Sequence, residues 1–208
     1  VGRPVAWTQE RTEHFLSCAH GRDNVVTLSL AFDADAKITA MKVDLVANMG
    51  AYLNQYAPFI PYVGVTMSTG LYDIPALDVK VRGVYTHTVP VDAYRGAGRP
   101  EAAYHLERAM DYAAAELGLD PAELRRRNFI RPDQLPYRTQ TGRLYDTGEF
   151  AGHLGDALQK ADRDGFEARR AASLANGKWR GLGFASYIEA CAFPGAENAE
   201  VILEADGT

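Results

Sequence analysis

Alternating apolar and polar residues predict β-strands in five stretches of the chain. These stretches are 26–32, 41–47, 77–85, 180–190 and 199–205. The first two are separated only by residues 33–37, so we expect them to form an antiparallel hairpin. Gly83 interrupts the third stretch and is predicted to mark a bulge. Residues 52–62 are rich in proline and aromatic side chains and show no clear period.

A helical period dominates the remaining sequence. We predict helices from Thr8 to about Ala19, from Pro100 to Leu117, from Pro121 to about Asn128, over 150–161 and over 164–176. The longest has one apolar stripe, formed by Ala103, Leu106, Met110, Ala113 and Leu117. Asp120, with Pro121 and Glu123 behind it, is typical of a capping box. The run Arg125–Arg127 is expected to be a solvated helix end, where cations favour the helix dipole.

These elements predict an α+β fold, with a mixed sheet that contains antiparallel hairpins and with helices packed on it. The length of 208 residues suits one domain, with possible sublobes at 1–92 and 93–208. The net charge of −5 argues against a nucleic-acid partner, and no apolar run is long enough to cross a membrane. Cys18 and Cys191 lie far apart, which favours reduced thiols in the cytoplasm. The five histidines show no metal-ligand spacing, so no metal ligand is predicted.

The most informative motif is Ala-Tyr-Arg-Gly-Ala-Gly-Arg-Pro, residues 93–100. Gly96 and Gly98 allow a tight turn and close approach of the backbone to a ligand. Pro100 suits the first turn of a helix, whose N-terminal N–H groups attract anionic or oxo groups. Two interpretations remain open from these residues alone. The loop either binds a ligand or only caps the helix that follows.

Residues 93–102 resemble the active-site loop of molybdenum hydroxylase large subunits, the xanthine oxidase and aldehyde oxidase superfamily. The chain is most similar to the carbon monoxide dehydrogenase large-chain-like group. Further similar segments follow in the same order, at 2–5, 10–15, 48–52, 71–75 and 123–130. Large subunits of that superfamily are several times longer. The resemblance therefore implies that residues 1–208 are a central piece of a molybdopterin-binding domain.

The resemblance also implies a site. It assigns the surroundings of the reaction centre to Arg95, Gly96, Ala97 and Gly98, and cofactor binding to Tyr94, Arg95, Gly96 and Gly98. It assigns a tentative substrate pocket to Ala97, Val63 and Glu189, and gives Glu101 no direct contact with the reacting groups. The expected cofactor is molybdenum–molybdopterin, in the cytosine dinucleotide form, bound by the parent protein and not by the isolated fragment. The expected partners are a small-molecule substrate and separate iron–sulfur and FAD subunits.

Departures from the superfamily pattern narrow the expected substrate. Copper-containing carbon monoxide dehydrogenases carry Cys where this chain has Gly96, and glycine offers no thiolate to copper. Purine hydroxylases carry an aromatic residue at Ala97 and an arginine at Val63. The reaction that remains expected is hydroxylation of an aldehyde or an N-heterocycle, with water as the oxygen source. The isolated fragment is expected to be inactive, and the alternative is a scaffold or assembly module that holds no metal.

Overall fold

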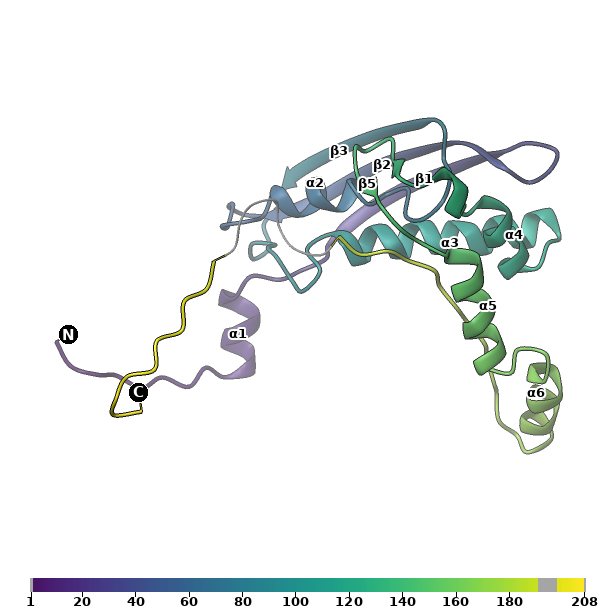
Figure 1. Ribbon diagram of the computed structural model, residues 1–208. Coiled ribbons are helices and arrows are strands. Elements are labelled where there is room, and N and C mark those ends of the chain that lie inside the picture. Colours follow the sequence, from purple (N-terminus) through teal and green to yellow (C-terminus); the bar gives the residue numbers. More distant parts are fainter. Residues whose placement is uncertain (1, 191–197, 208) are drawn as a thin grey trace.

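In a computed structural model that describes residues 2–190 and 198–207, a three-stranded sheet lies over one long helix (Figure 1). The strand order is β1-β2-β3. β1 (Asn24–Phe32) pairs antiparallel with β2 (Ile38–Gly50), which confirms the hairpin. β3 (Leu77–Tyr85) pairs parallel with β2 on its other side. The predicted mixed sheet and the α+β class are therefore confirmed.

One face of the sheet forms the core because the three strands are in matching register. Leu28 lies opposite Val43, which in turn lies opposite Val79. The buried residues of β2 are Ile38, Met41, Val43, Leu45, Ala47, Met49 and Gly50. The predicted bulge at Gly83 is wrong, since the irregularity lies between Asn48 and Gly50 of β2. Gly83 stays in register with Ala47, and its missing side chain leaves room for Met49, whose Cγ would lie 3.3 Å from a Cβ there.

α3 (Arg99–Leu117) packs against this face and is the longest helix. Its buried apolar residues follow a strict four-residue spacing: Ala102, Leu106, Met110 and Ala114. Four-residue rows are the ridges through which helices commonly pack. The prediction that placed Ala103 and Leu117 in the buried stripe is therefore wrong, because this row turns both towards the flank, and Leu117 is exposed.

The remaining elements are short. They are α1 (Arg11–Ser17), α2 (Phe59–Val65), α4 (Pro121–Asn128), η1 (Pro132–Gln134), β4 (Tyr137–Arg138), β5 (Leu144–Tyr145), α5 (Phe150–Lys160) and α6 (Phe166–Ala175). α2, η1 and the β4–β5 pair were not predicted. α1 begins later than expected because Glu10 and Glu13 form its capping box in place of Thr8. The Asp120 cap of α4 is confirmed, since its carboxylate accepts the N–H groups of Ala122 and Glu123.

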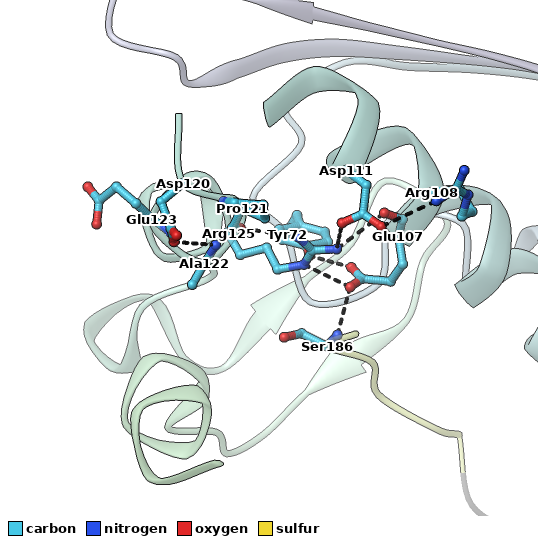
Figure 2. A network of polar contacts seen from close by, with 10 residues as sticks. All are labelled: Tyr72, Glu107, Arg108, Asp111, Asp120, Pro121, Ala122, Glu123, Arg125 and Ser186. Atoms are coloured by element: carbon cyan, nitrogen blue, oxygen red, sulfur yellow. Dashed lines mark hydrogen bonds and ion pairs between the residues drawn. The ribbon is translucent and has the colours of Figure 1, made fainter. Parts of the chain in front are cut away.

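Arg125 of α4 is fully buried, so the prediction of a solvated arginine run is wrong at this position. Its Nε lies 2.9 Å from Glu107 Oε2, and its Nη2 lies 2.9 Å from Asp111 Oδ1 (Figure 2). The Tyr72 hydroxyl donates to the other oxygen of Glu107. A buried charge is tolerated only when it is paired and hydrogen-bonded, and Glu107 on the neighbouring helix provides that pair.

The same network holds the segment that was predicted as a late strand. The Ser186 N–H donates to Glu107 Oε2 at 2.7 Å, and the Arg125 guanidinium lies 5.1 Å from the Phe184 ring centre. Residues 180–190 run back along α3 (Figure 1), and their exposure alternates from Phe184 to Ala190. They form no strand, because they pair with no other strand among the described residues. The strand predicted over 199–205 is also absent from the structure.

Replacing Arg125 with methionine is expected to lower the free energy of unfolding by about 3–5 kcal/mol, because Glu107 would keep a buried and uncompensated charge. Urea unfolding of the chain measures this loss. Arg131→Met is the control, since Arg131 pairs with Asp133 at the exposed surface. The control variant should unfold like the wild type. An equally stable Arg125→Met variant would contradict the assigned role of this ion pair.

Candidate functional site

The glycine loop before α3 has three successive residues with positive φ. The angles are 98° at Gly96, 48° at Ala97 and 87° at Gly98. Turn hydrogen bonds fix this conformation, from the Ala97 N–H to the Tyr94 carbonyl at 2.7 Å and from the Arg99 N–H to the Gly96 carbonyl at 3.1 Å. Gly98 is the N-cap residue of α3. The loop therefore delivers its backbone directly to a helix N-terminus, as the motif predicts.

Both glycines are required by contacts inside the protein. A Cβ on Gly96 would lie 2.3 Å from Cγ of Pro100. A Cβ on Gly98 would lie 2.2 Å from the Ile60 carbonyl oxygen of α2, and the Gly64 backbone is next to it. Positive φ adds a second reason for glycine at each position. The two glycines are thus explained by folding, and by themselves they do not indicate a ligand.

Arg99 connects the loop to the segment that runs along α3. Its Nε lies 2.9 Å from both the Gly96 carbonyl oxygen and Glu189 Oε1. Its Nη1 donates to the Ala190 carbonyl at 2.8 Å. The structure therefore brings Glu189 to the loop, although the two are 90 residues apart in sequence. Glu189 is there as an ion-pair partner of Arg99, and whether it also contacts a substrate stays a prediction.

Ala93, Tyr94 and Arg95 are the exposed residues of the loop. The Arg95 side chain makes no hydrogen bond or ion pair with any other described residue, while its backbone carbonyl accepts a hydrogen bond from Arg22. The Arg22 guanidinium also lies 4.7 Å from the Tyr94 ring centre. Arg22 could not be predicted from the sequence, because no local pattern connects it to a loop about seventy residues later.

The remaining predicted pocket residues differ in accessibility. Ala97 is half-buried in the loop. Val63 is buried in α2, directly before the Gly64 that touches Gly98, so it lies near the loop without being exposed to solvent. The roles of both residues in a substrate pocket stay predictions.

A small cavity lies beneath the first turn of α3. It holds about 20 Å³ and is lined in part by Ser68, Gly98, Glu101 and His105. Oε2 of Glu101 and Nε2 of His105 are buried and have no hydrogen-bond partner among the described residues. Burial lowers the pKa of His105, and the nearby Glu101 carboxylate partly opposes this shift. His105 is therefore predominantly neutral in the folded protein near pH 7.

An open groove of about 540 Å³ lies away from the loop, between β1 and the outer side of α3. Tyr104 and Tyr112 are on its wall. Within the described ranges, no group of three or more His, Cys, Asp or Glu side chains is arranged to hold a metal ion. None of the helices formed by these residues combines the length and the apolar character that a bilayer crossing requires.

Residues 1–129 match the family model of the molybdopterin cofactor-binding domain. The chain is 36% identical over 167 residues to the 6-hydroxypseudooxynicotine dehydrogenase complex subunit gamma of Paenarthrobacter nicotinovorans, which covers 78% of the chain and 21% of that relative. It is 37% identical over 195 residues to the carbon monoxide dehydrogenase large chain of Hydrogenophaga pseudoflava, covering 91% of the chain and 24% of the relative.

Among solved structures, quinoline 2-oxidoreductase from Pseudomonas putida 86 superposes with a TM-score of 0.78 at 31% identity. The match covers 85% of this chain and 23% of that one. The chain therefore spans about a fifth to a quarter of the length of the proteins it resembles. Both the sequence and the arrangement of strands and helices agree with this family.

Gly98→Ala should destabilise the chain more than Gly118→Ala. Both residues have positive φ, but a Cβ on Gly118 meets nothing within 4 Å. The left-handed backbone alone costs about 1–2 kcal/mol, and overlap with the Ile60 carbonyl adds about 1–3 kcal/mol at Gly98. Urea unfolding of both variants measures the difference. Equal losses would mean that α2 moves aside freely and does not constrain the loop.

Acidification should destabilise the chain through His105. A lowered pKa means that the unfolded state binds the proton more readily, so stability present above about pH 6.5 is lost as the pH falls towards the pKa of the folded state. His105→Gln removes this titration. Free energies of unfolding measured between pH 7.5 and 5 should therefore fall more steeply for the wild type. Parallel curves for the two proteins would contradict the lowered pKa.

Proposed function

The chain belongs to the molybdopterin cofactor-binding domain family, and from this premise we propose that it is part of the catalytic subunit of a molybdenum-dependent hydroxylase. The substrate is an aldehyde or an N-heterocycle, and water supplies the oxygen. The observation that carries the proposal is Arg95. It is an exposed guanidinium without an intramolecular partner among the described residues, whereas Arg99, the other charged residue of the loop, is paired with Glu189.

The loop suits an anionic or oxo group. The N–H groups of Arg95, Gly96 and Gly98 donate to no acceptor within the described ranges, and Gly98 is buried. Unpaired N–H groups at a helix N-terminus together with an arginine are typical of an anion-binding site. These residues fit the oxo and pterin-phosphate chemistry of a molybdenum–pterin cofactor. Tyr94, Arg95, Gly96 and Gly98 would hold it.

When bound, the molybdenum–pterin group would supply the two-electron acceptor for a hydroxylation in which a hydroxyl group from water replaces a hydrogen on the substrate carbon and two protons are released. The chain's own residues contribute position and charge. Arg95 and the free loop N–H groups stabilise negative charge that develops beside them. Arg99 holds the loop to the segment containing Glu189, and this segment lines the substrate side in our proposal together with Ala97 and Val63.

Three residues favour this substrate class. Gly96 has no thiolate with which to hold copper, so carbon monoxide is not the proposed substrate. Ala97 has no aromatic ring that could stack on a purine, and Val63 has no charged group that could bind one. A purine is therefore not the proposed substrate either. We propose that the cofactor is the cytosine dinucleotide form of molybdopterin. The proposed partners are iron–sulfur and FAD subunits in the cytoplasm. The isolated chain is proposed to be inactive and to bind no cofactor tightly.

A scaffold that holds no metal is the second candidate. The observation that favours it is the internal explanation of both glycines, since Gly96 is required by Pro100 and Gly98 by α2. A scaffold would keep these glycines without any ligand. It has no use for the exposed and unpaired Arg95, and this residue therefore separates the two candidates.

Arg95→Met in the full-length polypeptide, expressed with its partner subunits, should lower kcat/KM about ten- to hundredfold, which corresponds to one lost charged contact of about 1.5–3 kcal/mol. The wild type should contain close to one molybdenum per chain. It should turn over aldehydes or quinoline-type rings better than xanthine or carbon monoxide. Metal analysis and steady-state kinetics on this panel of substrates measure both properties.

Arg126→Met is the matched control, because Arg126 is also exposed and lies in α4, away from the loop. It should retain wild-type kinetics. Absence of molybdenum from the wild type would favour the scaffold. Xanthine or carbon monoxide as the best substrate would refute the substrate assignment made from Gly96, Ala97 and Val63.

A further inference from the structure

One arginine outside the loop contacts it at three points. The guanidinium of Arg22 lies 4.7 Å from the ring centre of Tyr94, and its Nη2 donates to the carbonyl oxygen of Arg95. Its Nε lies 3.6 Å from Oε2 of Glu101, in the first turn of α3. Arg22 thus connects the entry of the loop, its centre and the helix that follows.

The backbone around Arg22 is held against the same part of the chain. His20 forms a parallel bridge with Val91, in which the His20 N–H donates to the Pro90 carbonyl at 2.9 Å and the His20 carbonyl accepts from Asp92 at 2.7 Å. Gly21 fits only without a side chain, because its Cβ would lie 2.7 Å from that of Tyr94. Arg22 itself adopts a φ of 61°, which is uncommon for a residue with a side chain.

Two consecutive carbonyl groups of the loop are held by two different arginines. Arg22 binds the carbonyl of residue 95, and Arg99 binds the carbonyl of residue 96. A trans peptide is planar, so its N–H points away from its carbonyl. Fixing the carbonyl of residue 95 therefore directs the N–H of Gly96 away from Arg22. This N–H has no acceptor within the described ranges.

We propose that Arg22 is a positioning residue that fixes the Arg95–Gly96 peptide plane and so directs the Gly96 N–H and the Arg95 side chain towards the ligand. The ligand part of this inference rests on the proposed function. Without Arg22, glycine at position 96 would let this peptide rotate, since glycine tolerates both signs of φ. Lysine is a partial replacement, because it can pair with Glu101 but has no planar group to stack on Tyr94.

Hydrogen exchange tests the structural part in the full-length polypeptide. Arg22→Met should speed exchange of the Ala97 and Arg99 amides at least about tenfold, because both donate within the loop. The amides of α4 should exchange as in the wild type. Arg22→Lys should restore part of the protection. Arg82→Met is the control, since Arg82 pairs with Asp44 on the sheet and should leave the loop unchanged.

Molybdenum content and kinetics with benzaldehyde and quinoline as probes test the link to the reaction. Arg22→Met should keep its molybdenum and lose about tenfold or more in kcat with little change in KM, as expected for donors that act in the transition state. The proposal would be overturned if the loop amides of Arg22→Met exchanged as in the wild type, or if the α4 amides were accelerated equally. It would also be overturned if the loop amides exchanged faster and kcat stayed unchanged. A wild type without molybdenum would refute the proposed function, and the exchange comparison would still decide whether Arg22 orders the loop.

Discussion

The buried ion pair between Arg125 and Glu107 is the constraint on which the rest of the structure depends. It joins α4 to α3, and Tyr72 and Ser186 attach two further segments to the same carboxylate (Figure 2). Burial and the nearby Glu107 charge raise the pKa of Tyr72 well above its usual value, so its hydroxyl stays a donor. Because this carboxylate has so many partners, α3 has little freedom to shift. Any movement would leave the buried charges of Glu107 and Arg125 without their partners.

This constraint reaches the glycine loop through the chain itself. The segment fixed at Ser186 continues to Glu189 and Ala190, which bind Arg99 at the first position of α3. Asn128 of α4 also accepts the Ile38 N–H and donates to the Ala36 carbonyl, which fixes the turn of the β1–β2 hairpin. The loop is therefore attached to a helix that packs on the sheet and is joined to α4 by the buried ion pair. Such support keeps three successive left-handed residues in one conformation.

The sequence predicted the elements whose signals are local. Alternation identified β1, β2 and β3, and the Asp120 cap identified the start of α4. Prediction from the sequence failed where a residue distant in the chain determines the environment of a side chain or segment. Arg125 looks like a solvated helix end until Glu107 is placed beside it. Residues 180–190 alternate like a strand because one side packs on α3, and only the absence of a neighbouring strand among the described residues shows that they are extended but unpaired. For the same reason, the loop motif was visible from the sequence, whereas Arg22 was not.

Four arginines near α3 show how environment decides the role of one residue type. Arg125 is buried and holds helices together, while Arg22 and Arg99 each hold one carbonyl of the loop. Folding accounts for these three and for both glycines. It does not account for Arg95, which is exposed beside backbone N–H groups that have no acceptor within the described ranges. A side chain that contributes nothing to folding, placed on a loop held rigid by so many others, is expected where a ligand must be met in a fixed geometry. Arg95 therefore indicates a binding site more strongly than the two glycines of the loop, which folding alone explains.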